Sequence, residues 1–193
     1  QVKDSDASVL VTLSMWAGLA KQIQEGSGVP HVVLTDPAEY LSLPKYLISH
    51  WRNRAYGLRN AVRWGDFLGG NSTKSPTVEV APEDLAVIQY TGGTTAQSKG
   101  VMLSHRNLAS NTLVLVEYWG FRGDDVLLHA LPIYHVHGLF VATHCVLLSG
   151  SRMLFLPKFD AREVLRLLPR ASVLMGVPTF YTRLLAEPSF GAE

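Results

Sequence analysis

The stretch Gln89-Tyr90-Thr91-Gly92-Gly93-Thr94-Thr95-Ala96-Gln97-Ser98-Lys99-Gly100 gives the strongest indication of fold and chemistry. It combines three glycines, several hydroxyl side chains and one lysine, and it follows an apolar run at 85–88. A glycine-rich turn after a strand can present backbone N–H groups to an anion, and a lysine adds a compact charge for phosphate. The stretch therefore predicts a phosphate-binding loop, with a flexible surface turn as the alternative.

Two common nucleotide-binding motifs do not match this loop. A Walker A loop carries Ser or Thr after its lysine, whereas Lys99 is followed by Gly100, which argues against a P-loop kinase or NTPase. The dinucleotide fingerprint needs glycines at a fixed spacing that Gly92-Gly93 lacks. The loop thus belongs to another class of phosphate site.

Composition and charge narrow the class of protein further. Apolar residues make up 47% of the 193 residues and charged residues 17%, which indicates a folded globular chain. The net charge of +1 creates no global field for nucleic acid, so no nucleic-acid partner is expected. The single cysteine, Cys145, lies in an apolar run and is predicted to be a buried structural thiol. Without a signal peptide or a run of ~18 apolar residues, we expect a cytoplasmic protein.

The chain before the loop predicts an α/β fold. Strands are expected at 8–13 and 31–35, with a helix at 15–25 whose apolar residues recur at helical spacing. Such a strand–helix–strand unit is typical of parallel sheets. The chain opens at Gln1 and a strand pattern follows almost at once, so we expect part of a longer protein.

Residues 45–65 have a different character. Aromatic residues and no acidic one lie between 45 and 63, together with five basic side chains: Lys45, Arg52, Arg54, Arg59 and Arg63. Such a stretch can lie on a membrane surface, which makes peripheral membrane contact one hypothesis. The alternative is a solvated, partly helical insertion. Residues 67–76 then have the composition of a linker.

The chain after the loop continues the alternation of strands and helices. Ser104 is a candidate N-cap for a helix that ends near Gly120, and Asp160 is a candidate cap for a later helix. Strands are expected at 126–130, 152–156 and 172–175, and further helices at 139–148 and 179–186. The whole pattern predicts an α/β chain with mostly parallel strands.

Tyr134, His135 and His137 follow a predicted strand directly. Ligands of open α/β sheets gather at the carboxyl ends of strands, which makes these side chains candidates for a substrate site. Zinc could use two histidines at this spacing, but no third ligand is nearby in the sequence. Structural histidines that only form hydrogen bonds are the other alternative.

Three segments together resemble the adenylate-forming acyl-CoA synthetases, luciferases and peptide-synthetase adenylation domains. The loop is similar to that family's Thr-Ser-Gly-Thr-Thr-Gly-x-Pro-Lys-Gly pattern, from which it departs at Gly92, Ala96 and Ser98. The second and third signatures correspond to Leu131-Pro132-Ile133-Tyr134-His135 and Gly176-Val177-Pro178-Thr179. The resemblance implies an incomplete N-terminal AMP-binding domain over 1–193, with one part at 1–80 that carries the basic insertion, a second at 81–193, and the C-terminal domain absent.

The resemblance implies an ATP-dependent acid–CoA ligase. A carboxylate attacks the α-phosphate of ATP to give an acyl-adenylate and pyrophosphate, and coenzyme A then displaces AMP. His135 would be the catalytic residue beside the acyl carboxylate, and Thr95 a ligand of Mg²⁺. The ATP phosphates would be bound by Thr91, Gly92, Gly93, Thr94, Thr95 and Lys99, and the acid pocket would be formed by Tyr134, His137, Gly138, Pro178 and Thr179.

The two halves of the chain resemble enzymes for different acids. Residues 103–188 are most similar to malonyl-CoA synthetases and residues 9–95 to long-chain fatty-acyl-CoA synthetases. A polar His-Val-His turn suits a small carboxylate better than an alkyl chain, so malonate or another small acid is the prediction. A long-chain fatty acid is the alternative. If the position of Ala96 requires positive φ, alanine would strain the loop by ~1 kcal/mol; a non-catalytic nucleotide-binding fragment is therefore a further alternative.

Overall fold

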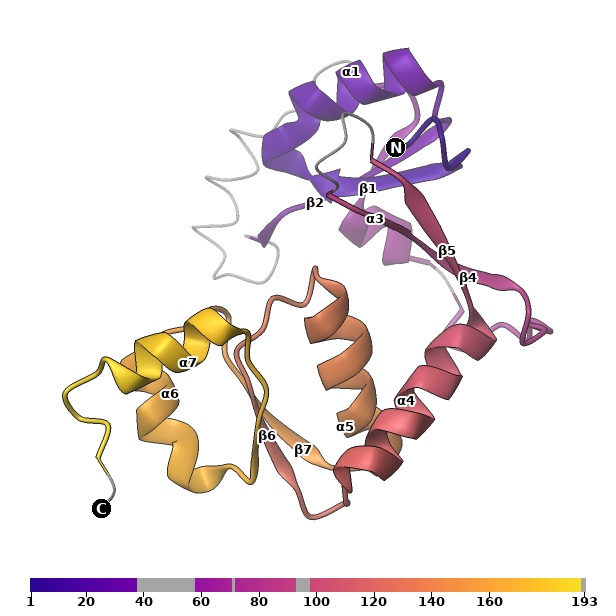
Figure 1. Ribbon diagram of the computed structural model, residues 1–193. Helices are drawn as coiled ribbons and strands as arrows, with labels where there is room; N and C mark the ends of the chain where they lie inside the picture. Colours follow the sequence, from indigo (N-terminus) through magenta and orange to yellow (C-terminus); the bar gives the residue numbers. More distant parts are fainter. Residues whose placement is uncertain (38–57, 71, 93–97, 192–193) are drawn as a thin grey trace. The chain divides into compact units, whose positions relative to one another are not determined.

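The computed structural model describes residues 1–37, 58–70, 72–92 and 98–191 (Figure 1). The chain divides into two compact units. The first unit comprises residues 1–80 and 87–102, and the second comprises residues 81–86 and 103–193. Each unit contains its own parallel sheet. The predicted α/β class with parallel strands is confirmed.

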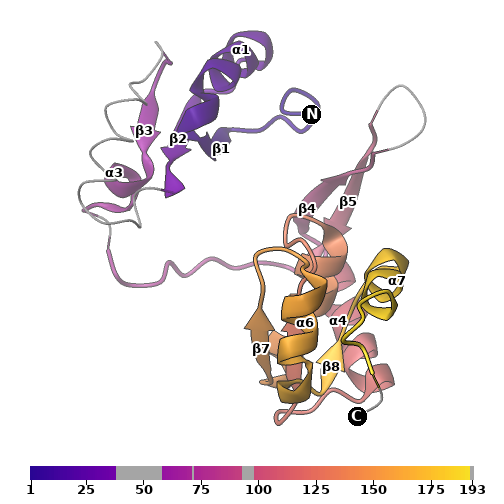
Figure 2. The ribbon, with the colours of Figure 1, turned by 90° about the vertical axis from the view of Figure 1, so that its left-hand side faces the viewer.

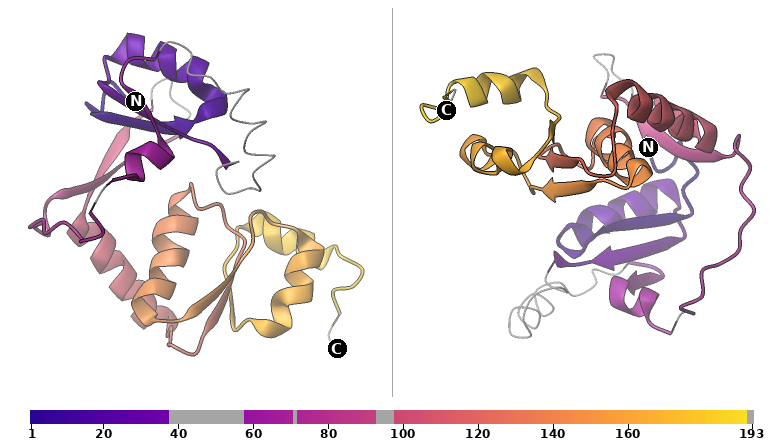
Figure 3. Two further views of the ribbon diagram at one scale, coloured as in Figure 1. Left: turned by 180° about the vertical axis from the view of Figure 1, so that it is seen from behind. Right: turned by 90° about the horizontal axis from the view of Figure 1, so that it is seen from below.

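The first unit is built on a parallel sheet in the order β1-β2-β3, made of β1 (Val9–Leu13), β2 (His31–Thr35) and β3 (Ala61–Arg63). A 3-10 turn, η1 (Ser14–Trp16), leads into α1 (Ala17–Ser27), which runs over one face of the sheet (Figure 3). Ala17 and Ala20 of this helix pack on Val32 and Leu34 of the central strand, and all four are buried. The predicted strand–helix–strand unit is therefore correct, and α1 ends where Gly28 adopts φ of 77°.

Two short elements of the first unit were not predicted. Residues Ala61–Arg63, within the basic stretch 45–65, form β3, and α3 (Trp64–Leu68) occupies the start of the predicted linker. Three residues are too few to show alternation, and β3 is held by parallel pairing with β2. Residues 38–57, which carry most of the basic stretch, lie outside the described residues. No helix in the part of the chain that the structure describes is long and apolar enough to cross a membrane.

A two-stranded hairpin carries the glycine-rich stretch. It consists of β4 (Leu85–Tyr90) and β5 (Gly100–Ser104), which lie side by side (Figure 2). Nine residues separate the strands, too few for a parallel crossover, so β4 and β5 are antiparallel. The predicted strand before the loop is confirmed.

Helix α4 (His105–Trp119) follows the hairpin and is capped as predicted. The Ser104 hydroxyl accepts a hydrogen bond from the backbone N–H of Asn107 at 3.2 Å, and the Asn107 side chain accepts one from the backbone N–H of Ser104 at 2.9 Å. This reciprocal pair satisfies two N–H groups that the helix leaves free. The helix ends at Gly120 in the left-handed conformation, φ 66°.

The second unit is built on a parallel sheet in the order β7-β6-β8. Helices cover both faces (Figure 1), and alternate residues of the central strand β6 serve the two cores. Leu127 packs with Cys145 and Val146 of α5, whereas Leu128 packs with Val164 of α6. The elements are β6 (Val126–His129), the π-helical segment η3 (His137–Thr143), α5 (His144–Ser149), β7 (Arg152–Phe155), α6 (Ala161–Leu167), η4 (Leu168–Arg170), β8 (Val173–Leu174) and α7 (Pro178–Leu185).

Cys145 and Asp160 have the positions that the sequence predicts. Cys145 is fully buried in the core beside β6, and burial raises the pKa of its thiol, as expected for a structural cysteine. The Asp160 carboxylate accepts a hydrogen bond from the backbone N–H of Glu163 at 3.0 Å and so caps α6. The predicted helix over 139–148 is instead two segments, because residues His137–Thr143 adopt the wider π-helical form and α5 begins only at His144.

Candidate functional site

The base of the predicted phosphate loop is closed by hydrogen bonds. The backbone N–H of Thr91 donates to the Lys99 carbonyl at 3.0 Å, and the Thr91 hydroxyl donates to the same oxygen at 3.4 Å. These bonds bring Gly92 and Ser98 to the two ends of a closed loop. Gly93, Thr94, Thr95 and Ala96 lie outside the described residues, so the roles predicted for them stay predictions.

Strand packing fixes the residues on either side of this loop. A Cβ atom at Gly100 would lie 2.7 Å from Cγ2 of Ile88 and 3.2 Å from the Tyr90 ring, so only glycine fits without a shift. The Tyr90 hydroxyl donates to the Asp4 carboxylate at 2.6 Å, and this hydrogen bond raises the pKa of Tyr90. The loop therefore starts from a strand that is tied to the first residues of the chain.

Lys99 is well suited to bind an anion. Its side chain is exposed, and it forms no ion pair with any residue that the structure describes. A lysine that is not neutralised by a carboxylate keeps its full charge for a phosphate. Thr91 and Gly92 are exposed as well, so both ends of the loop present polar groups to solvent.

The second predicted site is the turn that follows β6. The Pro132 carbonyl accepts a hydrogen bond from the backbone N–H of His135 at 3.2 Å, and the His135 carbonyl accepts one from Leu139 at 3.0 Å. The Nδ1 atom of His135 accepts a hydrogen bond from the backbone N–H of His137 at 3.2 Å. Nδ1 of His135 is therefore unprotonated, and Nε2 carries the hydrogen of the neutral ring. The His135 side chain is exposed, and Tyr134 is 87% exposed.

His137 is partly buried beside two other histidines. Burial lowers its pKa, and the nearby His135 and His129 lower it further. The lowered pKa favours the neutral form of the His137 ring, which offers hydrogen bonds. Within the described ranges, no three His, Cys, Asp or Glu side chains come together to hold a metal ion.

Gly138 has a packing reason to be glycine. A Cβ atom at this position would overlap the backbone carbonyl of Pro132, with the carbonyl carbon only 2.7 Å away. The Gly138 carbonyl also lies 2.9 Å from Nε2 of the buried His129 and accepts a hydrogen bond from the Thr143 hydroxyl at 2.9 Å. His129 is a residue that the sequence did not single out. The only feature of the sequence that could have identified His129 is its polar side chain at the end of an otherwise apolar strand.

The third motif lies beside the second. Strand β8 pairs with β6, so the residues that follow the two strands leave the same edge of the sheet. Pro178 begins α7, and its fixed φ suits the first helical position. The aromatic ring of Phe180 stacks on that of Phe159, with 3.8 Å between the ring centroids, and this contact anchors the start of α7. The structure thus brings Tyr134, His135, His137 and Gly138 to the same edge as Pro178 and Thr179.

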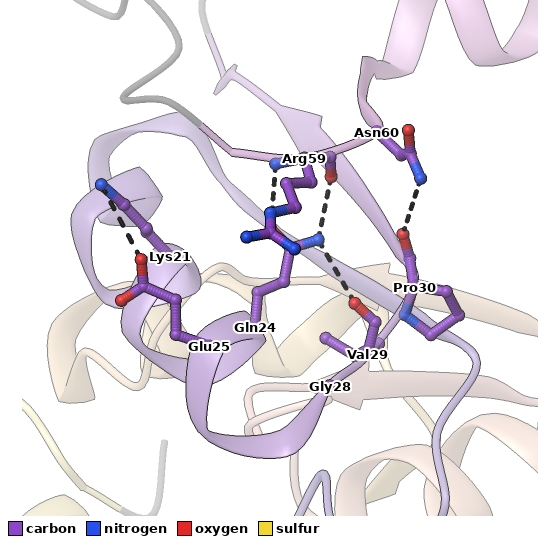
Figure 4. A pocket seen from close by; sticks show the side chains of 8 residues that line it. All are labelled: Lys21, Gln24, Glu25, Gly28, Val29, Pro30, Arg59 and Asn60. Atoms are coloured by element: carbon purple, nitrogen blue, oxygen red, sulfur yellow. Dashed lines mark hydrogen bonds and ion pairs between the residues drawn. The ribbon is translucent and has the colours of Figure 1, made fainter.

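A surface pocket of about 370 Å³ lies in the first unit and involves none of the predicted site residues (Figure 4). Gln24 spans it: its amide nitrogen donates to the Arg59 carbonyl at 2.8 Å, and its oxygen accepts from the Arg59 N–H at 3.0 Å. Lys21 and Glu25 pair at 3.9 Å on its rim. These interactions tie α1 to the residues before β3. The pocket is lined by Lys21, Gln24, Glu25, Gly28, Val29, Pro30, Arg59 and Asn60.

Comparison with known proteins identifies the family. The chain belongs to the AMP-binding enzyme family, whose model matches residues 1–193. The long-chain-fatty-acid–CoA ligase of Bacillus subtilis (strain 168) is 31% identical over 97% of this chain and 36% of its own length. The mitochondrial malonate–CoA ligase of Homo sapiens is 41% identical over 52% of this chain and 18% of its own length.

A solved structure supports the same assignment. The crystal structure of ATP-bound MatB from Rhodopseudomonas palustris is 43% identical, with a TM-score of 0.67, and the match covers 89% of this chain and 34% of that one. The chain spans about a third of the length, 36%, of the Bacillus ligase that it matches almost from end to end. The predicted membership in the adenylate-forming family is therefore confirmed.

Proposed function

We propose that the protein is an ATP-dependent acid–CoA ligase that forms an acyl-adenylate and then an acyl-CoA thioester. The observation that carries this proposal is the family match over 1–193, within which the three motif segments follow one another in the family's order. We further propose that residues 1–193 are part of the large N-terminal domain of that enzyme, with residues 45–65 as a basic insertion that includes the short strand β3.

The loop between β4 and β5 would bind the phosphates of ATP. The hydrogen-bonded base supports this role, and so does Lys99, which forms no ion pair within the described ranges, since a phosphate needs several N–H donors and a cation held close together. Mg²⁺ would neutralise phosphate charge when bound, with Thr95 as the proposed ligand. The other proposed phosphate-binding residues are Thr91, Gly92, Gly93 and Thr94.

The edge of the β7-β6-β8 sheet would bind the acid. In the Nε2–H form, His135 points a donor away from the turn and can hold the carboxylate that reacts. His137 lies two residues further along the turn, and burial lowers its pKa, so its neutral ring can donate to a second polar group of a small acid. Coenzyme A would reach the adenylate from the side of His135. The remaining proposed pocket residues are Tyr134, Gly138, Pro178 and Thr179.

Malonate or another small carboxylic acid is the proposed substrate. Sequence identity to the human malonate–CoA ligase is 41% but covers half of the chain, whereas sequence identity to the Bacillus long-chain ligase is 31% over nearly all of it. Two histidines at the edge of the acid site can form hydrogen bonds with a second polar group of a small acid, and an alkyl chain would leave them unpaired, which disfavours a fatty acid. A long-chain fatty acid is the second candidate, favoured by the extent of the Bacillus match.

The test is acid-dependent release of pyrophosphate from ATP by the full-length protein. Malonate, acetate, octanoate and palmitate are compared at equal concentrations, and formation of the CoA thioester is followed in parallel. Higher kcat/KM for malonate supports the small-acid pocket, and higher kcat/KM for palmitate supports the alternative. If none of these acids releases pyrophosphate while ATP still binds, the ligase proposal fails and a non-catalytic nucleotide-binding role replaces it.

A further inference from the structure

His129 is a buried polar residue at the centre of the second unit. It is the last residue of β6 and is 1% exposed. Its Nε2 atom lies 2.9 Å from the Gly138 carbonyl oxygen and 3.3 Å from the Thr143 hydroxyl oxygen. The imidazole therefore bridges the end of the central strand and both ends of the π-helical segment that follows it.

The partners of Nε2 determine where the ring carries its hydrogen. A carbonyl oxygen can only accept, so the contact with Gly138 requires an N–H at Nε2 of His129. The Thr143 hydroxyl uses its own hydrogen to donate to the same carbonyl at 2.9 Å, so its lone pairs face Nε2. In the neutral ring Nδ1 is then unprotonated, and it has no hydrogen-bond partner among the described residues. The single tautomer that satisfies the cluster is Nε2–H.

The hydrogen bonds among His129, Gly138 and Thr143 hold the turn between β6 and η3 in place. Gly138 lies against the Pro132 carbonyl so closely that no side chain fits, and its own carbonyl is the oxygen that His129 and Thr143 share. Between Pro132 and Gly138 the turn carries His135 and His137 to the sheet edge. If the imidazole of His129 is removed, the Gly138 carbonyl keeps the Thr143 hydroxyl as a donor but loses the donor on β6, and with it the hydrogen bond that links the turn to the strand.

We infer that His129 is a positioning residue for the acid site: its Nε2–H fixes the Gly138 carbonyl and thereby the placement of His135 and His137. This inference rests on the proposed function. It also predicts a selective effect, because none of the described contacts of the phosphate loop involves His129. Loss of the donor should weaken use of the acid and leave use of ATP unchanged.

Two substitutions of similar polarity separate positioning from mere core packing. The amide nitrogen of His129→Gln reaches the place of Nε2, whereas the shorter side chain of His129→Asn does not. In the full-length protein we expect H129N to raise KM for malonate, or for whichever of the four tested acids the wild type uses, by about five- to tenfold, the factor for one lost hydrogen bond. H129Q should stay within about twofold, and KM for ATP should be unchanged in both variants.

Equal effects of the two substitutions, or equal rises in KM for the acid and for ATP, would overturn the inference. If a variant does not fold, ¹⁵N NMR of the imidazole nitrogens in the wild-type protein decides instead. An unprotonated Nδ1 with a protonated Nε2 supports the cluster, and the opposite tautomer refutes it. A wild type that releases no pyrophosphate with any acid refutes the proposed function, whereas an active wild type with an unaffected acid KM in H129N refutes this inference alone.

Discussion

Replacement of Gly138 by alanine is the sharpest structural perturbation that this chain offers. The added methyl group would lie 2.7 Å from the Pro132 carbonyl carbon and closer still to its oxygen, whereas carbon atoms in contact prefer about 3.5–4.0 Å. Both obstructing atoms belong to the backbone, so no side chain can rotate away. The turn itself must move by about 1 Å, which costs ~1–3 kcal/mol as overpacking.

A movement of this size also stretches the hydrogen bonds of the Gly138 carbonyl. His129 lies 2.9 Å from that oxygen, and Thr143 donates to it at 2.9 Å, and the loss of each bond removes ~1 kcal/mol. Part of the strain is relieved when the bonds lengthen, so we expect a total loss of about 2–4 kcal/mol in the free energy of unfolding.

Urea unfolding of the full-length protein, followed by circular dichroism, measures this loss. With a slope of ~2 kcal/mol per molar, the unfolding midpoint of Gly138→Ala should fall by about 1–2 M. Gly123→Ala is the matched control, since a Cβ at Gly123 meets only the Ser149 carbonyl at 3.5 Å, an ordinary contact. Its effect should remain within ~1 kcal/mol. Equal midpoints for the two variants would show that the turn is not packed as described.

Three further predictions concern other parts of the chain. Lys99→Ala should lower acid-dependent pyrophosphate release about 10²- to 10³-fold, whereas the exposed Lys74→Ala should not, and equal rates would exclude a phosphate role for Lys99. Ser104→Ala should lower the free energy of unfolding by ~1 kcal/mol, because the N-cap of α4 is lost. The control Ser110→Ala, inside the same helix, should lower it by less than ~0.5 kcal/mol. A larger loss for Ser110→Ala than for Ser104→Ala in urea unfolding would contradict the capping geometry. His137 has a lowered pKa in the folded state, so the unfolded state binds more protons, and the free energy of unfolding falls as the pH drops through ~6.5, the pKa of an unperturbed histidine. His137→Gln should therefore flatten the dependence of the urea midpoint on pH between about 7.5 and 5.5. Parallel curves for the variant and the wild type would refute this prediction.

Features with local chemical causes were predictable from the sequence. The cap at Ser104 and the helix end at Gly120 depend on residues within one turn, and both are present as predicted. Strand β2 has the predicted bounds because an apolar run between Pro30 and Asp36-Pro37 leaves little freedom in where a strand starts and stops. The order of strands and helices follows from the same local signals.

Features that depend on distant contacts were not predictable. Strand β3 exists because Val62 pairs beside Val33, about 30 residues earlier in the chain, and its own three residues show no periodicity. The buried His129 bonds to the carbonyl of Gly138, which lies in the π-helical segment, and nothing in the sequence marks that carbonyl as shared. For the candidate site, the sequence identified the residues at the rim, such as Tyr134 and His135, and overlooked the support beneath them.

The turn between β6 and η3 has an uneven tolerance for change that bears on how such enzymes diversify. Its two ends are locked, by the contact of Gly138 with Pro132 and by the buried imidazole of His129. Its tip is open, with Ile133 48% and Tyr134 87% exposed. Mutations at the tip can therefore accumulate at little cost to folding and alter what the rim contacts. The exposed surface of this turn can thus change in evolution while the packed residues that hold its two ends stay the same.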